Sequence, residues 1–376
     1  MPLLGDIRGT THSIKLNRRA SSARRMNQHN AAMPITPHRI VYTLTAVLLS
    51  FCTWSANSNP TQSGQISHPC TGPSRDVSLD SFAIYKQLNT LYEGAQFDQL
   101  EMAMTCLMTT TERLKSGHSG ANAVYAFYRI RMPAPGVRHD EPDRVNRWRK
   151  AKPQSLFAEF ASLRLNYALA WSARSSGFAA EVSPRAWHVF YEGLSATERA
   201  LKKASPSVKQ TPLWQQLLFA TLQDQPDSRG SAEAVFAEGV RKWPGFYDLY
   251  EAGISRTTPY WNGSWARTEE FADRWSRSLA DTEGDSLYAR LYLHLAWWNG
   301  IDPRTTHASW PRLRLSLIEL VERYPTAMHI NLAASLACLY SDQEAYRKVI
   351  KGIPAFMTDV WLFDTDFRSC SKRLIP

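Results

Sequence analysis

The sequence predicts an all-α protein in which antiparallel helix pairs stack into a curved α-solenoid. Apolar residues recur at helical spacing from Leu79 almost to the end of the chain. No stretch shows the sustained period-two alternation that is typical of a β-sheet. An amphipathic segment ending in basic, aromatic and proline residues occurs at Glu238–Pro244 and again, 81 residues later, at Glu319–Pro325. This offset is about two helical-repeat units, and stacked repeats of this kind form curved arrays.

The first two predicted helices begin at Leu79 and near Asp98. Gly94 fits a C-terminal cap for the first helix, and Asp98 with a glutamate three residues later resembles a capping box at the start of the second. Residues 116–152 are less regular. Their glycines, prolines and the dense charge run from Arg138 to Lys152 predict a loop or an insertion with a solvated, mixed-sign surface.

Helices resume after Pro153 and continue almost to the C-terminus. Ser183-Pro184 and Thr211-Pro212 each combine a good N-cap with proline at the first helical position. The predicted helices cover residues 154–174, 185–204, 213–222, 231–243, 245–256, 265–280, 286–298, 310–324, 327–340 and 343–350.

The positive charge of the chain is concentrated in its N-terminal segment. The 376 residues include 44 Lys and Arg against 34 Asp and Glu, a formal net charge of +10. Residues 1–39 hold seven basic side chains and one acid, whereas residues 57–376 hold 37 basic and 33 acidic groups. The nearly balanced body therefore removes the main reason to expect nucleic-acid binding, and we expect no nucleic-acid partner.

Residues 40–56 are uncharged and mostly apolar, which suits a signal-peptide core or a short membrane anchor. Basic residues precede this segment, as the positive-inside rule requires, and a Ser-, Asn- and Pro-rich linker follows it. We therefore expect a basic segment (1–39), a signal or anchor (40–56), a linker (57–78) and a helical-repeat domain (79–376). Met33 as the true start and cleavage of the apolar segment both stay open. Contact with a membrane is expected only through residues 40–56.

Five cysteines bear on the compartment of the protein. Cys52 lies in the apolar segment, and Cys70, Cys106, Cys338 and Cys370 follow it. In an exported protein the last four could form disulfides, with three pairings possible. Cys338 with Cys370 is the favoured pair, because both lie in the last helical unit, and a buried free thiol is the alternative. No C-x-x-C occurs, so neither a redox motif nor a zinc ribbon is supported.

Five short segments carry a family resemblance: Trp148 followed by Ala151–Ser155, Ala173–Ala179, Pro259–Gly263 with Asn262 in place of a glycine, Asp285–Leu291 and Asn331–Cys338. In this order along the chain they resemble a bacterial family known as domain of unknown function 4034. The similarity runs from about Leu79 to Cys370, and none of its motifs is specific alone. The resemblance implies a tetratricopeptide-like helical fold and no established activity, and it transfers no catalytic residue.

No catalytic, metal or cofactor motif is complete. Gly117–Ala121 begins like a nucleophile elbow, but Ala121 replaces the closing glycine and helix and loop flank it. The ten histidines, including His188 and His294, show no metal spacing, and no phosphate-binding glycine loop occurs. Carboxylate pairs such as Glu269 with Glu270 and Asp364 with Asp366 are expected to be solvated. We therefore predict no catalytic residue, no metal and no cofactor.

The aromatic residues are the best candidates for ligand contacts. Thirteen tryptophans are many for this length, although most are expected to fill gaps between helix pairs. Exposed ones could instead anchor a peptide, a protein or a glycan on a concave surface, where Arg174 could pair with a ligand carboxylate or cap its helix. The candidate ligand-binding residues are Arg174, Trp261, Trp265, Trp297 and Trp298.

The sequence thus favours a non-enzymatic protein of the bacterial cell envelope, exported to the periplasm or anchored in the inner membrane. It would bind a protein or peptide partner along the inner curve of its helical array. One alternative is an envelope enzyme that acts on glycan or peptide bonds, which a deep polar pocket or a Ser–His contact would favour. The other is a glycan-binding module that uses exposed aromatic residues.

Overall fold

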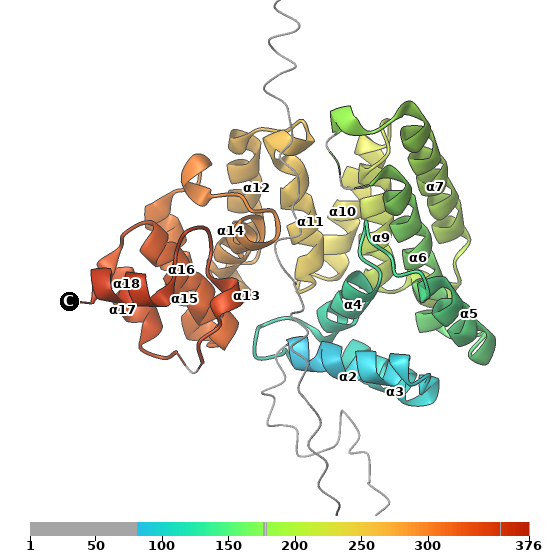
Figure 1. The fold of residues 1–376 in the computed structure, drawn as a ribbon, viewed down its shortest axis with the longest axis horizontal. Helices are drawn as coiled ribbons and strands as arrows, with labels where there is room; N and C mark the ends of the chain where they lie inside the picture. The colour runs from blue at the N-terminus through green and yellow to red at the C-terminus, as the bar shows by residue number, and fades with distance from the viewer. Residues whose placement is uncertain (1–80, 176, 178, 354, 376) are drawn as a thin grey trace, which may run out of the picture.

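The computed structural model describes residues 81–375 except 176, 178 and 354, and this part of the chain contains helices and no strand (Figure 1). The prediction of an all-α protein is confirmed. The predicted basic segment (1–39), apolar segment (40–56) and linker (57–78) lie outside the described residues. Within the described ranges, no helix is both long enough and apolar enough to cross a membrane.

The helices follow one another with short connections, four of which contain a 3-10 turn. The α-helices are α2 (Ser81–Glu93), α3 (Phe97–Thr109), α4 (Gly120–Arg131), α5 (Glu141–Ala151), α6 (Leu156–Arg174), α7 (Pro184–Lys203), α8 (Pro206–Lys209), α9 (Pro212–Gln223), α10 (Arg229–Lys242), α11 (Tyr247–Thr257), α12 (Trp265–Ser278), α13 (Ala280–Glu283), α14 (Ser286–Trp298), α15 (Trp310–Arg323), α16 (Ala327–Leu339), α17 (Gln343–Ile350) and α18 (Phe367–Leu374). The 3-10 turns are η1 (Ala179–Glu181), η2 (Pro259–Trp261), η3 (Pro303–Thr305) and η4 (Thr358–Val360).

Most helices form consecutive pairs that lie side by side (Figure 1). The pairs are α6 with α7, α9 with α10, α11 with α12, α14 with α15, and α16 with α17. Each pair also contacts the next pair along the chain, so that no pair has to bury its apolar residues alone.

The two helices of a pair are buried to different extents. In the second helix of a pair, the buried residues form one stripe, as Leu313, Leu317 and Leu320 do in α15. In the first helix, burial extends around the whole surface, and in α14 every residue from Ser286 to Leu293 is buried. A first helix therefore needs cover on the side that faces away from its partner.

The prediction for residues 116–152 is wrong, because this segment contains α4 and α5. Ser119 begins α4, and both its backbone N–H and its Oγ donate to Asn122 Oδ1. Tertiary packing then makes α4 part of the core, where Phe127 and Tyr128 are fully buried. Most of the charge run lies on the solvated side of α5, above buried Trp148, but Glu141 is buried and pairs with Arg131.

Helix α4 covers the side of α6, α9 and α11 that faces away from the partner helix, and it also reaches the end of α14. The contact to α6 is a hydrogen bond from Tyr128 OH to Phe157 O, 2.9 Å long. At α11, Asn122 Nδ2 donates to Asp248 Oδ2 over 2.7 Å. At α14, the Arg129 guanidinium lies 4.6 Å from the centre of the Trp298 ring.

The segment Arg113–Ser119, which leads into α4, extends this cover toward α14 and α15. Arg290 of α14 donates from Nη2 to the carbonyl of Ser116 over 2.5 Å, and Arg113 donates to Tyr247 OH over 2.7 Å. Gly117 has a φ of +80°, and a Cβ at this position would lie 2.5 Å from Arg290 Nη2. Only glycine fits there. The segment thus packs against α11, α14 and the end of α15.

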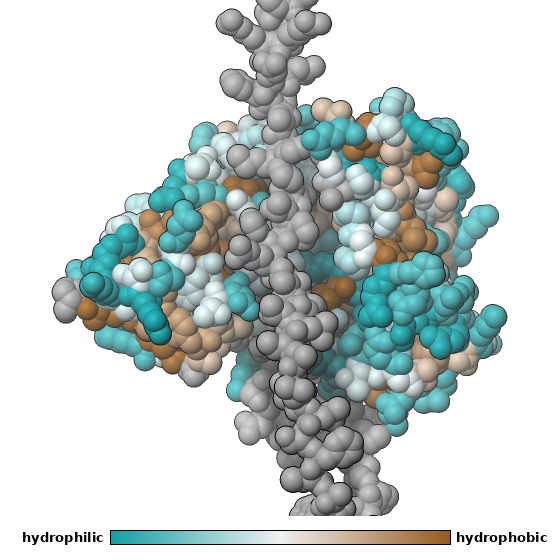
Figure 2. Space-filling view, viewed as in Figure 1, coloured by the Kyte–Doolittle hydropathy of each residue, from teal (hydrophilic) through white to brown (hydrophobic). Residues whose placement is uncertain are grey.

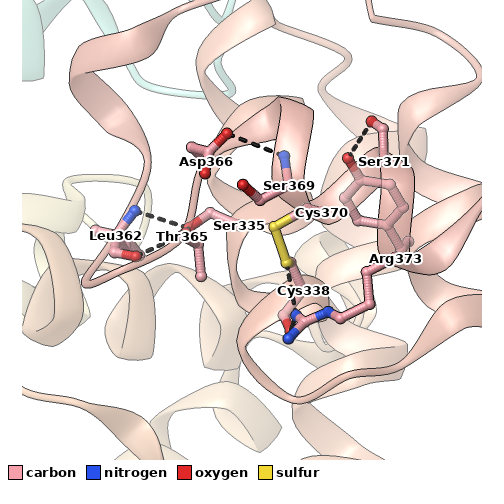
Figure 3. Close-up of a disulfide and its surroundings, with 10 residues drawn as sticks. Ser335, Cys338, Leu362, Thr365, Asp366, Ser369, Cys370, Ser371 and Arg373 are labelled. Atoms are coloured by element: carbon pink, nitrogen blue, oxygen red, sulfur yellow. Dashed lines mark hydrogen bonds between the residues drawn. A yellow bond between two sulfur atoms is a disulfide. The ribbon is translucent and has the colours of Figure 1, made fainter.

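A disulfide joins Cys338 of α16 to Cys370 of α18, the pair that the sequence favours (Figure 3). The two Cα atoms are 5.7 Å apart, and the cysteines are separated by 32 positions. Arg373 lies beside the bridge and donates to the carbonyl of Cys338 over 2.7 Å. A loop of this length corresponds to about 3–4 kcal/mol of stabilisation in the chain-entropy model. The bridge therefore holds the short C-terminal helix on the last helix pair.

Buried His329 makes stability depend on pH. The side chain is 7% exposed and packs near Arg290, and its Nδ1 lies 2.9 Å from the carbonyl of Tyr324. Burial, followed by the positive charge of Arg290, lowers the pKa of His329 from 6.5 to about 3. Below pH 6.5 the unfolded chain therefore binds a proton at this position that the folded chain does not bind.

We expect acidification below pH 6.5 to lower the free energy of unfolding by about 1.4 kcal/mol per pH unit through this group. In His329→Asn, whose amide can still donate to Tyr324, the loss between pH 7.5 and pH 5 should be smaller by about 2 kcal/mol. Urea unfolding at both pH values measures the difference. Exposed His188→Asn is the control and should behave as the unsubstituted protein. Equal pH dependence of His329→Asn and the unsubstituted protein would contradict the prediction.

Candidate functional site

The C-terminal ends of α6, α9 and α11 meet the start of α7, and aromatic and arginine side chains gather at this edge of the array. We call this group the arginine–tryptophan cluster. Helices α6 and α7 approach closely because of Gly193, where a Cβ would lie 2.7 Å from the Cβ of Ala170. The cluster consists of Trp171, Arg174, Trp187, Tyr191, Asp224, Arg256 and Trp261.

Asp224, at the end of α9, is the anchor of the cluster. Its Oδ2 accepts hydrogen bonds from Tyr167 OH over 2.7 Å and from Trp171 Nε1 over 2.8 Å. Its Oδ1 pairs with the guanidinium of Arg256. Only 1% of the carboxylate side chain is exposed, so its charge is balanced inside the protein by Arg256. One residue thus ties α6, α9 and α11 together.

Arg174, the last residue of α6, lies between two indole rings. Its guanidinium carbon is 5.2 Å from the centre of the Trp171 ring and 4.7 Å from that of Trp187. It donates from Nη1 to the carbonyls of Ser175 and Gly177, which follow the helix. Burial lowers the pKa of the guanidinium, which still stays charged at neutral pH. Arg174 therefore holds the segment that follows α6 and also places a positive charge at the edge.

Trp261, in η2 just after α11, completes the cluster. Its ring packs edge-on against Trp171 with 6.3 Å between centres, and the Arg256 guanidinium lies 3.5 Å above it. The turn that holds it ends in Asn262, which has a φ of +61°. Asparagine tolerates this left-handed conformation better than most residues do, which explains how it can stand where a glycine is expected.

The structure brings only two of the predicted ligand residues, Arg174 and Trp261, into one group. Trp265 begins α12 and packs edge-on against Tyr260, next to the cluster. Trp297 and Trp298 contact each other at the end of α14, with Trp298 45% exposed and in contact with Arg129. Among the described residues, no ring or charge contact joins this pair to Arg174.

A second polar group lies between α11 and α14, at Glu251, Ser255 and His294. Ser255 Oγ is 3.1 Å from His294 Nε2, and His294 Nδ1 is 3.2 Å from a Glu251 oxygen that lies off its N–H direction. Although burial opposes ionisation, His294 and Arg129 hold the pKa of Glu251 below its usual range. Ser255, His294 and Glu251 thus follow one another in the order of the nucleophile, the base and the orienting carboxylate of a catalytic triad.

This Ser–His contact lacks the surroundings that acyl transfer needs. Ser255 Oγ donates to the carbonyl of Glu251 over 2.9 Å, so its proton is engaged away from His294. The serine lies in the last turn of α11, where the helix dipole disfavours a developing oxyanion. Among the described residues, its remaining polar neighbour is the Asn299 side chain, with Oδ1 3.4 Å away. The three side chains serve to join α11 to α14.

The other residues considered from the sequence have structural roles. Ser119 caps α4 instead of forming a nucleophile elbow. Glu269 accepts hydrogen bonds from the hydroxyls of Tyr288 and Tyr292, and Asp366 caps α18. No group of three or more His, Cys, Asp or Glu side chains that could hold a metal ion occurs in the part of the chain that the structure describes.

The two best-formed hollows in the described part of the chain are open surface grooves. One is lined by residues of α7, among them Tyr191 of the arginine–tryptophan cluster, and the other by residues along α17. Neither groove includes Ser255. Figure 2 shows hydrophilic and hydrophobic residues interspersed over the visible face, in keeping with a mixed surface.

Comparison with known proteins finds no matching family model, no similar curated protein and no similar solved structure. The resemblance to domain of unknown function 4034 therefore gains no support from family models and stays a prediction.

Sequence reasoning missed Asp224 and Arg256, and it assigned no ligand role to Trp187 or Tyr191. Asp224 and Arg256 are 32 positions apart, and the contact to Trp171 spans 53 positions. No local pattern marks such pairs. The helix-end position of Arg174 and the density of aromatic residues were the signals present in the sequence.

We expect Asp224→Ala to lower the free energy of unfolding by about 3–5 kcal/mol, because it leaves Arg256 and two buried donors without their partner. Asp224→Asn keeps an acceptor but removes the charge, and should have an intermediate effect. Urea unfolding followed by circular dichroism measures both. Exposed Asp227→Ala is the matched control. A loss for Asp224→Ala no larger than that of the control would show that the carboxylate is not an anchor.

Proposed function

We propose that this chain is a non-enzymatic helical-repeat protein of the bacterial cell envelope that binds a protein or peptide partner. The stacked helix pairs support a tetratricopeptide-like α-solenoid, the architecture that domain of unknown function 4034 would also imply. Arrays of this kind present long surfaces to other chains without needing a catalytic site.

The observation that carries the proposal is the half-exposed arginine–tryptophan cluster at the edge of the array. Trp187, Tyr191 and Trp261 are partly accessible, and tryptophan, tyrosine and arginine are the residues that most often dominate binding energy at interfaces. Because Arg113–Ser119 and α4 fill much of the inner curve, the proposal places the partner at this edge.

Two observations favour binding over catalysis. The Ser255 hydroxyl donates to the carbonyl of Glu251 in the last turn of α11, and neither of the two surface grooves includes Ser255. An enzyme of the envelope, the alternative from the sequence, would need a polar cleft that encloses such a contact.

The disulfide supports the proposed location. Bridges such as Cys338–Cys370 persist in oxidising compartments, which include the bacterial periplasm. The apolar residues 40–56 provide a means of export or anchoring.

We expect a photo-reactive benzoylphenylalanine at Tyr191 of the full chain to cross-link one discrete partner in envelope fractions. The replacement keeps the phenyl ring of a side chain that already lies at the cluster, and it adds a benzoyl group in place of the hydroxyl. Mass spectrometry of the cross-linked band identifies the partner. Leu315 is the matched control position, because it is 59% exposed on the outer helix α15.

The cross-linking experiment contradicts the proposal if position 191 yields the same bands as position 315, or none. A cross-linked product that peptidoglycan hydrolases digest would instead favour the glycan-binding alternative.

We expect Cys338 and Cys370 to resist a thiol-reactive maleimide in acid-quenched cells until a reductant is added, because export leads to oxidation. The double substitution Leu48→Arg, Leu49→Arg should disable the apolar segment, retain the chain in the cytoplasm and leave both thiols reactive. Mass spectrometry of tryptic peptides measures the labelling. Reactive thiols in the unsubstituted protein would contradict the proposed location.

A further inference from the structure

We propose that Arg174, held between Trp171 and Trp187, is a subsite for a carboxylate of a peptide, with Trp187 and Tyr191 receiving the neighbouring apolar side chain. This inference rests on the proposed function and specifies the chemistry of the partner.

The first argument is the unpaired charge of Arg174. No Asp or Glu of the described residues lies within 4.0 Å of its guanidinium, whereas nearby Arg256 is paired with Asp224. Both of its hydrogen bonds, to Ser175 and Gly177, use Nη1. Nε and Nη2 have no partner among the described residues, and neither is a buried unpaired atom. Nε and Nη2 are thus two parallel donors, of the kind that bind a carboxylate in bidentate geometry, that make no hydrogen bond to the described residues.

The second argument is the local charge balance. Asp224 is buried, and its oxygens already accept from Arg256, Tyr167 and Trp171. It therefore pairs directly with Arg256 and acts on Arg174 only from a distance. An anion that reaches Arg174 meets no competing carboxylate among the described residues in contact with it.

The third argument is preorganisation. The guanidinium is held against two indoles, and Trp187 stacks on Tyr191 with 5.3 Å between ring centres and 17° between planes. Trp171, in turn, is buried and hydrogen-bonded to Asp224. Little side-chain freedom is lost when a ligand binds to groups that are already fixed.

The same contacts favour a peptide over a glycan. A sugar needs free aromatic faces together with several polar groups that receive its hydroxyls. Here Arg256 covers a face of Trp261 and Arg174 lies over Trp171, while Asp224 has no free oxygen for a hydroxyl. The Arg174 guanidinium lies beside the partly exposed rings of Trp187 and Tyr191. This arrangement fits a peptide carboxylate with a neighbouring apolar side chain.

The test uses the full chain and three pools of fluorescein-labelled random hexapeptides. The first pool has a free C-terminal carboxylate and no Asp or Glu. The second has an amidated C-terminus and includes Asp and Glu. The third is amidated and contains Asn and Gln in their place. Fluorescence polarisation measures binding of each pool to the unsubstituted protein, to Arg174→Gln, to Arg174→Lys and to Arg185→Gln.

We expect at least one carboxylate pool to bind about tenfold or more tightly than the third pool. Which pool binds distinguishes a chain terminus from an acidic side chain. Arg174→Gln should abolish the preference, and Arg174→Lys should reduce it because an ammonium cannot provide the planar fork. Arg185→Gln, which removes an exposed charge at the start of α7, should leave it unchanged.

Equal binding of all three pools, binding of none, or a preference that survives Arg174→Gln overturns the inference. So does tight binding of an oligogalacturonate, an acidic glycan probe, in place of the peptide pools. These outcomes leave the proposed function standing if Tyr191 still cross-links a discrete partner, so the two failures are distinguishable. Circular dichroism of each variant verifies that it is folded.

Discussion

The structure depends on one requirement: in the first helix of a pair, the side that faces away from the partner helix must also be buried. In α14 the residues from Ser286 to Leu293 are all buried, so α15 cannot cover the helix alone. Helix α4 and Arg113–Ser119 supply the missing cover. Buried carbonyls of that irregular segment need donors, and Arg290 provides one to Ser116. The faces of α11 and α14 that meet this cover are thus part of the core, and partly exposed aromatic side chains lie at the helix ends around Arg174.

The edge has its own electrostatic requirement. Asp224 places a carboxylate at the end of α9, where the helix dipole disfavours negative charge. Arg256 and the donors Tyr167 and Trp171 compensate for this cost. The hydrogen bond to Asp224 also fixes the Trp171 indole, over which the Arg174 guanidinium lies. The contacts that stabilise Asp224 therefore also position Arg174.

The arginines of the helical part of the chain also have structural roles. Many of these side chains lie on aromatic rings inside the molecule and do not form a basic outer surface. Arg290 lies between Tyr247 and Tyr324, and Arg312 lies over Tyr288. Such arginines join neighbouring helices, and several of them also pair with carboxylates. A modest excess of positive charge in residues 57–376 is therefore compatible with packing and gives no support to nucleic-acid binding.

The sequence by itself determined the helical class, most helix positions from 154 onward and the favoured cysteine pair, because periodicity, caps and proline signals are local. It could not determine that residues 116–152 contain α4, because glycine, proline and charge mask a helix whose stability comes from burying Phe127 and Tyr128. Nor could it join Arg174 to Asp224 and Trp261. Only the tertiary structure decides which helix ends meet, since those contacts depend on how whole helices pack across long sequence separations.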